Sequence, residues 1–314
     1  MKVFVTGSTG FLGDYIVKEC MKRKYKITAF VHKENLEKKK NIISEFVKKG
    51  VRVRYGDITS FDDVKGALNE DYDIIFHLAS VTQNNSNKNF VVDVIGTKNL
   101  FKAIKEIKIK RILYMSTTGV YGPQKSDKDL DENSLCKPRT NYEISKYKTE
   151  ELVKKFCTKY KIAYIIIRSP RIYGPQDWQK TFLNYIKLVK MGITIVLGNL
   201  PISLVYIKNL THGIFLSLRS KNETFIISNE NTYTAKEIAN TVEKIIKPKF
   251  SIRVCVPKIF TRLVSITTGK FIYGTNNVRY STKKFKQKFH YKDSYSLEES
   301  LRETIAWYKN KNML

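Results

Sequence analysis

Tyr142 and Lys146 lie four residues apart in the run Tyr-Glu-Ile-Ser-Lys. On a helix this spacing places a phenol and an ammonium group on the same face. A free phenol has a pKa near ~10, and an adjacent cation stabilises the phenolate and lowers that pKa toward neutrality. The pair therefore predicts a general acid and base, in which Tyr142 exchanges the proton and Lys146 assists it.

A third polar group is expected on the strand that precedes this helix. A strand-like run ends in Ser116-Thr117-Thr118. Ligands of doubly wound sheets bind at the carboxyl ends of the strands, so these hydroxyl groups are expected at the same edge as the tyrosine and lysine.

Three glycines spaced three residues apart follow the first strand-like run, at Gly7, Gly10 and Gly13. Glycine permits a tight turn, removes a side chain where a pyrophosphate approaches the backbone, and lets the following helix pack close to the strand. A phosphate there would meet unpaired N–H groups and the positive end of a helix dipole. The loop therefore predicts a dinucleotide site, to which we assign Gly7, Thr9, Gly10, Phe11, Leu12 and Gly13.

The end of the second strand-like run indicates which dinucleotide is expected. NAD sites of this kind usually carry an acid there for the ribose hydroxyls, but this chain has Val31-His32-Lys33. Cations suit a 2′-phosphate, so NADP is favoured, with His32 and Lys33 as its ligands and Arg54 as a more distant candidate. Glu34 follows directly and keeps NAD open as the alternative.

Short strand-like runs alternate with longer helix-like segments in the first part of the chain. Strands are predicted at 2–6, 27–31, 51–55, 74–77, 111–116 and 163–168, and helices at 11–23, 89–107 and 142–160. Asp62 and Asp63 indicate the first turn of a shorter helix. This order predicts an α/β fold, a Rossmann-type doubly wound parallel sheet.

The alternation of strands and helices breaks down after Gly174-Pro175. We therefore expect a Rossmann NAD(P)-binding domain over 1–174 and a smaller, interleaved C-terminal substrate-binding region over 175–314. A strand-like run at 204–207 and a helix-like run at 209–218 predict that residues 204–228 return to the main sheet.

The chain has 314 residues, enough to bury a large core without disulfides or metals. Hydrophobic residues make up 42% of it, and no run approaches the ~20 apolar residues of a membrane span. None of the four cysteines has a short paired spacing, so neither a metal site nor a disulfide framework is predicted. Met1-Lys2 leads straight into a strand-like run without the pattern of a signal peptide, so a cytoplasmic protein is expected.

Lysine and arginine number 57 against 29 aspartate and glutamate, a formal charge of +28. Such a charge suits an anionic partner such as nucleic acid. Lysine, however, is enriched together with isoleucine, asparagine and tyrosine along the whole chain, as A/T-biased coding would produce. The densest local stretch is 279–292, where lysines alternate with Phe285, Phe289 and Tyr291. No nucleic-acid module is visible there, so nucleic acid is not expected as a partner.

Six motifs follow one another along nearly the whole chain. They are Thr6-Gly7-x-x-Gly10-x-x-Gly13, Gly56-Asp57-Ile58, His77-Leu78-Ala79-Ser80, Ser116-Thr117-Thr118-Gly119-Val120-Tyr121-Gly122, Tyr142-x-x-x-Lys146 and Arg168-x-Pro170-x-x-Tyr173-Gly174-Pro175. Together they resemble the extended short-chain dehydrogenase/reductases, the superfamily of NAD(P)-dependent epimerases and dehydratases. One position departs from the pattern: the helix motif that usually begins with Asn begins here with Asp93, and no role is carried over to it.

The resemblance implies roles for the matching residues. Tyr142 would donate or remove the proton, Lys146 would also bond the nicotinamide ribose, and Thr117 would orient the substrate oxygen. Asp57 and Ile58 would contact the adenine. The cofactor cleft would also include Leu78, Ala79, Ser80, Ser116 and, near the nicotinamide, Pro170.

The substrate residues distinguish the reactions of this superfamily. Sugar-nucleotide members typically have Asn before Tyr-Gly-Pro and Arg-Asp-Phe before the late strand, whereas this chain has Arg171 and Pro201-Ile202-Ser203. The run Leu204-Val205-Tyr206-Ile207-x-Asn209-Leu210 instead resembles the 3β-hydroxysteroid dehydrogenase and dihydroflavonol-reductase-like branch. The favoured hypothesis is reversible hydride transfer between NADP(H) and a carbonyl or secondary alcohol of a hydrophobic small molecule.

Two alternative functions stay open. One is a nucleotide-sugar epimerase or dehydratase with tightly bound NAD, and the other is a non-catalytic binding protein that senses NADP. The apolar, helix-like run at 256–271 is either core or a lid, or a face that touches a membrane supplying the substrate. A homodimer is expected.

Overall fold

The strands of the central sheet are rich in apolar residues because the sheet is buried on both faces. In β5 (Ile109–Thr117), Ile112 and Tyr114 pack in the core on one face, and the alternating Leu113 and Met115 are buried on the other. The computed structural model describes residues 1–82, 86–123, 129–177, 180–196, 199, 201–229, 231–255 and 278–314, apart from the side chains of residues 86, 180 and 181.

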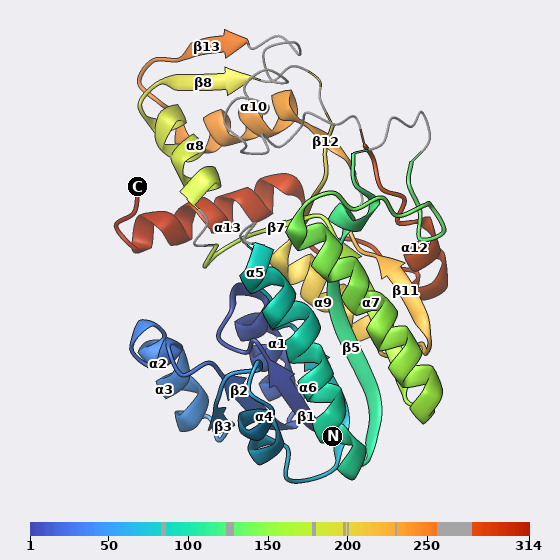
Figure 1. Ribbon diagram of the computed structural model, residues 1–314. Helices are drawn as coiled ribbons and strands as arrows, with labels where there is room; N and C mark the ends of the chain where they lie inside the picture. The colour runs from blue at the N-terminus through green and yellow to red at the C-terminus, as the bar shows by residue number, and fades with distance from the viewer. Residues whose placement is uncertain are drawn as a thin grey trace. The chain divides into compact units, whose positions relative to one another are not determined.

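The central sheet has seven strands in the order β11-β6-β5-β4-β1-β2-β3, and every neighbouring pair is parallel. The strands are β1 (Lys2–Thr6), β2 (Lys26–Val31), β3 (Arg52–Tyr55), β4 (Tyr72–His77), β5, β6 (Ala163–Ser169) and β11 (Glu223–Ile226). The strand order reverses direction between β1 and β4, which is where doubly wound sheets bind their ligands. The predicted Rossmann-type α/β fold is confirmed (Figure 1).

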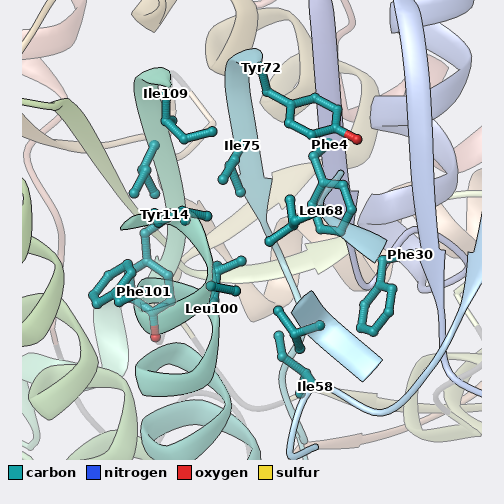
Figure 2. Packing of buried hydrophobic residues seen from close by; sticks show 14 of the residues in the cluster. Phe4, Phe30, Ile58, Leu68, Tyr72, Ile75, Leu100, Phe101, Ile109 and Tyr114 are labelled. Atoms are coloured by element: carbon teal, nitrogen blue, oxygen red, sulfur yellow. The ribbon is translucent and has the colours of Figure 1, made fainter. Parts of the chain in front are cut away.

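Helices connect these strands, as right-handed parallel crossovers require. They are α1 (Phe11–Lys22), α2 (Asn35–Lys38), α3 (Lys40–Lys48), α4 (Phe61–Ala67), α5 (Ser86–Asn89), η1 (Phe90–Ile95), α6 (Gly96–Ala103), η2 (Ile104–Glu106), η3 (Thr118–Tyr121), α7 (Asn141–Tyr160) and α9 (Ile207–Ser217). Helices α4, α6 and α7 bury one face of the sheet. Their core, drawn in Figure 2, includes Phe4, Ile75, Leu100, Phe101 and Tyr114.

The predicted helix at 89–107 is interrupted. Its first part is the π-helix η1, its middle is α6 and its end is the 3₁₀ turn η2. Within it the Thr97 hydroxyl donates to the carbonyl of Asp93, four residues earlier. Apolar periodicity predicts only that such a segment is helical, whereas the type of each turn depends on what its polar groups contact.

The chain divides into two units, and each unit is made of separate segments of the sequence. The first unit contains residues 1–122, 135–169 and 211–226, and the second contains 123–134, 170–210 and 227–314. The strand expected at 204–207 to rejoin the main sheet does not do so. As β10 (Leu204–Tyr206) it pairs with β7 (Arg171–Tyr173), whereas β11 is the strand of this stretch that enters the main sheet.

The second unit contains short strand pairs and helices. Besides β7 and β10 they are α8 (Lys180–Lys190), β8 (Ile193–Val196), β9 (Pro201–Ile202), β12 (Tyr233–Thr234), α10 (Ala235–Ile246), β13 (Ile252–Cys255), α12 (Lys283–Phe289) and α13 (Leu297–Asn310). The apolar run at 256–271 lies outside the described residues. Within the described part, no helix combines the length and the apolar character of a membrane span.

The basic stretch at 279–292 forms α12 and its flanks. Phe285 and Tyr291 are buried there, and their rings pack against each other at 5.2 Å. Phe289 stacks on the same cluster, 4.9 Å from Phe285. The rings of Phe285 and Tyr291 therefore pack inside the second unit.

Candidate active site

The turn between β1 and α1 is built from backbone that approaches its neighbours closely. Gly7 has φ +66°, and a Cβ there would come within 2.8 Å of the backbone nitrogen of Ala79. A Cβ at Gly13 would lie only 2.0 Å from the carbonyl oxygen of Gly7. Gly10 begins the helix, and no side chain caps it. The first N–H groups of α1 therefore remain available to an anion at this turn.

This turn opens into a cleft of about 570 Å³ formed by the ends of β1, β2, β3 and β4. Of the residues predicted to bind the cofactor, it is lined by Gly7, Thr9, Gly10, His32, Asp57, Ile58, Leu78, Ala79 and Ser80. The cleft is also lined by Glu34, which keeps NAD open in the sequence analysis, and by Gly56 of the second motif. Its remaining lining residues were not selected from the sequence, and they are Phe30, Asn35, Thr59, Val81, Asn87, Lys88, Val91 and Val92. Many of these are chain neighbours of a motif residue, and that adjacency could have identified them.

Other predicted cofactor residues do not line this cleft. Leu12 and Gly13 pack inward at the start of α1, and Phe11 stacks its ring edge-on against Tyr15. Ser116 is buried and donates a 2.5 Å hydrogen bond to Glu150. Pro170 belongs to the second unit. These residues therefore support the loop or the sheet, and a cofactor contact remains a prediction for each of them.

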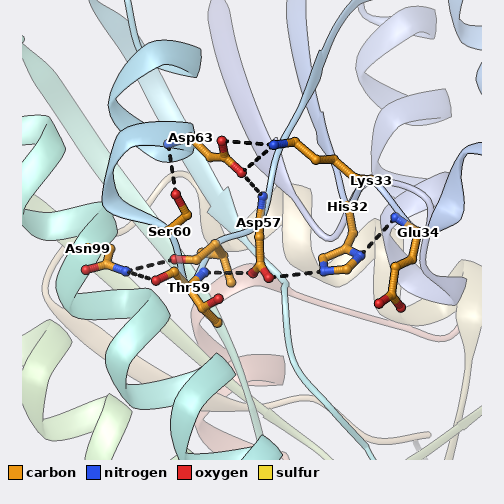
Figure 3. A network of polar contacts seen from close by, with 9 residues as sticks. His32, Lys33, Glu34, Asp57, Thr59, Ser60, Asp63 and Asn99 are labelled. Atoms are coloured by element: carbon orange, nitrogen blue, oxygen red, sulfur yellow. Dashed lines mark hydrogen bonds and ion pairs between the residues drawn. The ribbon is translucent and has the colours of Figure 1, made fainter.

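The two cations expected to bind a 2′-phosphate are each paired with a carboxylate (Figure 3). Lys33 Nζ lies 3.0 Å from Asp63, and Lys33 does not line the cleft. His32 Nε2 lies 3.4 Å from Asp57, while His32 Nδ1 accepts a hydrogen bond from the backbone N–H of Glu34. Neither side chain is therefore a free cation in the cleft.

Electrostatics stabilise the charged form of both carboxylates in these pairs. Partial burial opposes ionisation of Asp57, but hydrogen bonds from Thr59 and the neighbouring His32 outweigh burial and lower its pKa. A hydrogen bond from the backbone N–H of Asp57 and the ammonium of Lys33 lower the pKa of Asp63. Two ionised carboxylates therefore lie beside the two expected phosphate ligands at the rim of the cleft.

Thr6 and His77, at the ends of β1 and β4, position the backbone that lines the cleft. Thr6 Oγ1 accepts hydrogen bonds from the N–H groups of Leu78, at 3.1 Å, and Ala79, at 3.2 Å. The same hydroxyl is 2.9 Å from His77 Nδ1. Because its acceptor role is already taken twice, Thr6 is the donor to His77.

The contacts of His77 also determine its tautomer. Thr97 Oγ1 donates to a backbone carbonyl in η1, so it accepts from His77 Nε2–H at 2.8 Å. His77 is fully buried and neutral, because burial and the charge of Lys146 lower its pKa to about 3. A chain of hydrogen bonds thus connects the sheet to η1.

Tyr142 and Lys146 lie on α7, whose N-terminus is fixed by a capping box. Thr140 accepts from the backbone N–H of Glu143, and the Glu143 carboxylate accepts from the backbone N–H of Thr140. Tyr142 is half-buried in the first turn. Lys146 is only 2% exposed, and its Nζ lies 4.4 Å from the centre of the Tyr114 ring. Its ammonium makes no hydrogen bond to any described residue, which leaves its donors available to a ligand.

Thr117 ends β5 and caps η3. Its Oγ1 accepts a 3.1 Å hydrogen bond from the N–H of Gly119, so its own hydrogen remains available for donation. Gly119 also approaches Glu143 in the first turn of α7. The end of β5 and the start of α7, which carry Thr117 and Tyr142, are therefore adjacent within the first unit.

Behind α7 lies a buried ion pair that the motifs did not identify as part of the site. Arg168 of β6 donates to both carboxylate oxygens of Glu150, with the shortest bond at 2.7 Å, and donates to the hydroxyl of Tyr121. Hydrogen bonding to Glu150 outweighs burial and raises the pKa of Arg168. This pair fixes α7 on the sheet. Among the described residues, no group of three or more metal-binding side chains comes together.

Comparison with known proteins identifies relatives of the chain. The model of the NAD dependent epimerase/dehydratase family matches residues 3–227. A protein of Methanocaldococcus jannaschii described as a putative UDP-glucose 4-epimerase is 26% identical over 334 residues, which cover 99% of each chain. The dTDP-D-glucose 4,6-dehydratase of Homo sapiens is 30% identical over 200 residues, 60% of this chain and 56% of that protein.

A solved structure has the same fold. The UDP-glucuronic acid 4-epimerase of Bacillus cereus, in complex with UDP-glucuronic acid and NAD, superposes with a TM-score of 0.81 at 21% identity, covering 99% of this chain and 100% of that one. The names of these relatives favour the nucleotide-sugar alternative over the reductase acting on a hydrophobic molecule. A preference for NADP finds no support among them.

Proposed function

The chain belongs to the NAD dependent epimerase/dehydratase family, and from this membership we infer that it is an enzyme that uses bound NAD to epimerise or dehydrate the sugar of a nucleotide sugar. The observation that carries this inference is the length of the similarity. The archaeal relative aligns over 99% of this chain, which includes the second unit as well as the dinucleotide-binding part. A shared Rossmann domain alone would not extend the similarity that far.

The cleft of the first unit suits NAD. Side chains at Gly7 and Gly13 would collide with backbone, so the loop keeps the open cradle that a pyrophosphate needs. The uncapped N-terminus of α1 adds unpaired N–H groups and a favourable dipole. Bound NAD would supply the acceptor and then the donor of a hydride.

The chain's own residues would move the proton. Tyr142 would remove the proton of a sugar hydroxyl as that carbon is oxidised, and it would return a proton when the carbonyl is reduced. Thr117 would donate a hydrogen bond to the same substrate oxygen, because its own hydrogen is not donated to any residue that the structure describes. Lys146 would stabilise the phenolate and bond the cofactor ribose. The protein ends the cycle with its cofactor in the starting redox state.

NAD is the cofactor that the charges of the cleft favour. A 2′-phosphate would need a free cation at the end of β2, but Lys33 and His32 are paired with Asp63 and Asp57. Glu34 lines the same cleft and would repel the phosphate. Calorimetry with NAD and NADP measures the preference directly, and tighter binding of NADP would contradict it.

A variant tests whether the pairing of Lys33 causes this preference. Asp63→Asn removes the partner of Lys33 and should strengthen NADP binding by about 2- to 5-fold, the range expected for one exposed charge pair. The double variant Asp63→Asn with Lys33→Ala is the matched control, and it should lose that gain. An equal gain in both variants would rule out Lys33 as the cause.

The reaction is tested with the purified protein and a panel of UDP-glucose, UDP-glucuronic acid and dTDP-glucose. We expect NAD to be released in stoichiometric amount when the protein is denatured, and one of the sugars to be converted without net change in NADH absorbance. Turnover of small ketones with net consumption of NADPH, and none of any nucleotide sugar, would instead identify a simple reductase.

A further inference from the structure

Lys146 lies at a site where burial opposes the charged form of its ammonium group. Its side chain is 2% exposed, and its Nζ lies over the ring of Tyr114 without a hydrogen bond to any described residue. Burial lowers the pKa of Lys146, and the negative charges of Asp93 and Glu150 act in the opposite direction. An ammonium in this position needs an uncompensated negative charge nearby to remain protonated.

The groups around Lys146 differ in whether they can supply that charge. Glu150 is held by two nitrogens of Arg168, so its charge is already balanced. His77 is neutral, and burial raises the pKa of the Tyr114 phenol, so this ring is neutral as well. The lysines of α5 and α6, which are Lys88, Lys98 and Lys102, are exposed.

Asp93 differs from these groups. It lies in η1, is 1% exposed, and accepts a 2.6 Å hydrogen bond from the hydroxyl of Ser145, the residue just before Lys146. The same hydroxyl lies 2.9 Å from the carbonyl oxygen of Tyr142, so Asp93 contacts the segment between the two proposed catalytic residues. The second carboxylate oxygen of Asp93 is buried and has no hydrogen-bond partner among the described residues. Asp93 therefore has a negative charge that no described cation contacts directly.

We propose that Asp93 is a positioning residue that holds Lys146 in its charged form beside Tyr142. The inference rests on the proposed function, because it assigns Asp93 to the same proton-transfer site. A neutral asparagine at this position could accept the hydrogen bond from Ser145 but could not supply the charge. The aspartate at position 93, where the usual pattern has asparagine, thus stabilises the charged form of Lys146.

The direct test is the protonation of Lys146 in the whole protein, followed by NMR of isotope-labelled lysine side chains and assigned with Lys146→Met. In Asp93→Asn the pKa of Lys146 should fall by about 1 unit or more, as expected for loss of one close opposite charge. Asp14→Asn is the matched control, since Asp14 is equally buried but lies in α1 and pairs with Lys18. It should leave the titration of Lys146 unchanged.

An unchanged pKa of Lys146 in Asp93→Asn, or an equal shift in Asp14→Asn, would overturn the proposal. If Asp93→Asn does not fold, the wild-type titration still decides, because a Lys146 that is neutral at neutral pH contradicts the role of Asp93. Turnover gives the second readout: the alkaline limb of its pH profile should move to lower pH in Asp93→Asn. The NMR titration needs no substrate, so it can succeed while the proposed reaction fails, or fail while nucleotide sugars are turned over.

Discussion

At the scale of single residues, the proposed chemistry of this protein depends on one phenol and on the charged groups near it. The spacing of Tyr142 and Lys146 places them on the same helix face, but spacing alone does not make the ammonium buried or charged. In the structure, burial lowers the pKa of Lys146, the charge of Asp93 opposes that shift, and His77 of β4 is neutral. The proposed reactivity of Tyr142 therefore depends on groups from three elements, α7, η1 and β4.

Replacing Tyr142 by phenylalanine removes the hydroxyl that exchanges the proton and keeps the ring. Turnover should fall by about 10²- to 10⁴-fold, the usual contribution of a general acid or base. Binding of NAD, measured by calorimetry, should be unchanged because the glycine loop is untouched. Tyr147→Phe, the same change five residues along α7, is the control and should keep full activity. Retention of turnover by Tyr142→Phe would refute its assignment.

At the scale of elements, the turn between β1 and α1 determines whether the cleft exists. Gly13→Ala would place a Cβ 2.0 Å from the carbonyl oxygen of Gly7, so the helix must move away from the strand. We expect loss of NAD binding and a lower free energy of unfolding. Gly66→Ala, in α4, is the control because nothing lies within 4 Å of its added Cβ. That variant should bind NAD normally and gain up to about 1 kcal/mol of stability.

The attachment of α7 to the sheet depends on the buried pair of Arg168 and Glu150. Arg168→Met leaves the Glu150 carboxylate buried without its partner, and the free energy of unfolding should fall by about 3–5 kcal/mol. Lys154→Met removes the more exposed pair with Glu151 on the same helix and should cost less than about 1 kcal/mol. Urea unfolding measures both. Similar losses of unfolding free energy in the two variants would contradict the larger stabilising effect expected of the buried pair.

At the scale of the whole molecule, stability should decline in mild acid because His77 is buried in its neutral form. Its folded pKa is about 3, and an unfolded histidine takes up a proton below about 6.5. The unfolded state therefore binds more protons than the folded state between these values, so stability is lost as pH falls through that window. The aspartates with lowered pKa, such as Asp57 and Asp63, act only at lower pH, below about 4.

As the pH is lowered from about 6.5 to about 5, the temperature of the unfolding midpoint should therefore decrease, before the carboxylates titrate. His77→Asn should show a lower midpoint with a flatter dependence on pH in this window, because its site no longer takes up a proton on unfolding. His290→Asn, at an exposed position, should keep the wild-type slope. Parallel slopes in His77→Asn and the wild-type protein would show that another group is responsible.

The sequence by itself predicted the glycine turn between β1 and α1, the central sheet and the location of Tyr142 and Lys146 on one helix, because these features depend on local spacing and on the period of apolar residues. It did not show that Lys33 and His32 pair with carboxylates, because their partners Asp63 and Asp57 lie about one βα unit further along the chain. Their charges looked available to a phosphate, and only the packing of β2 beside β3 brought carboxylates to them. It also left open the substrate and the role of Asp93, because a carboxylate 52 residues before Ser145 meets it only when η1 packs against α7. Contacts between distant segments are set by packing in three dimensions, and such contacts decide which charges of this active site remain free.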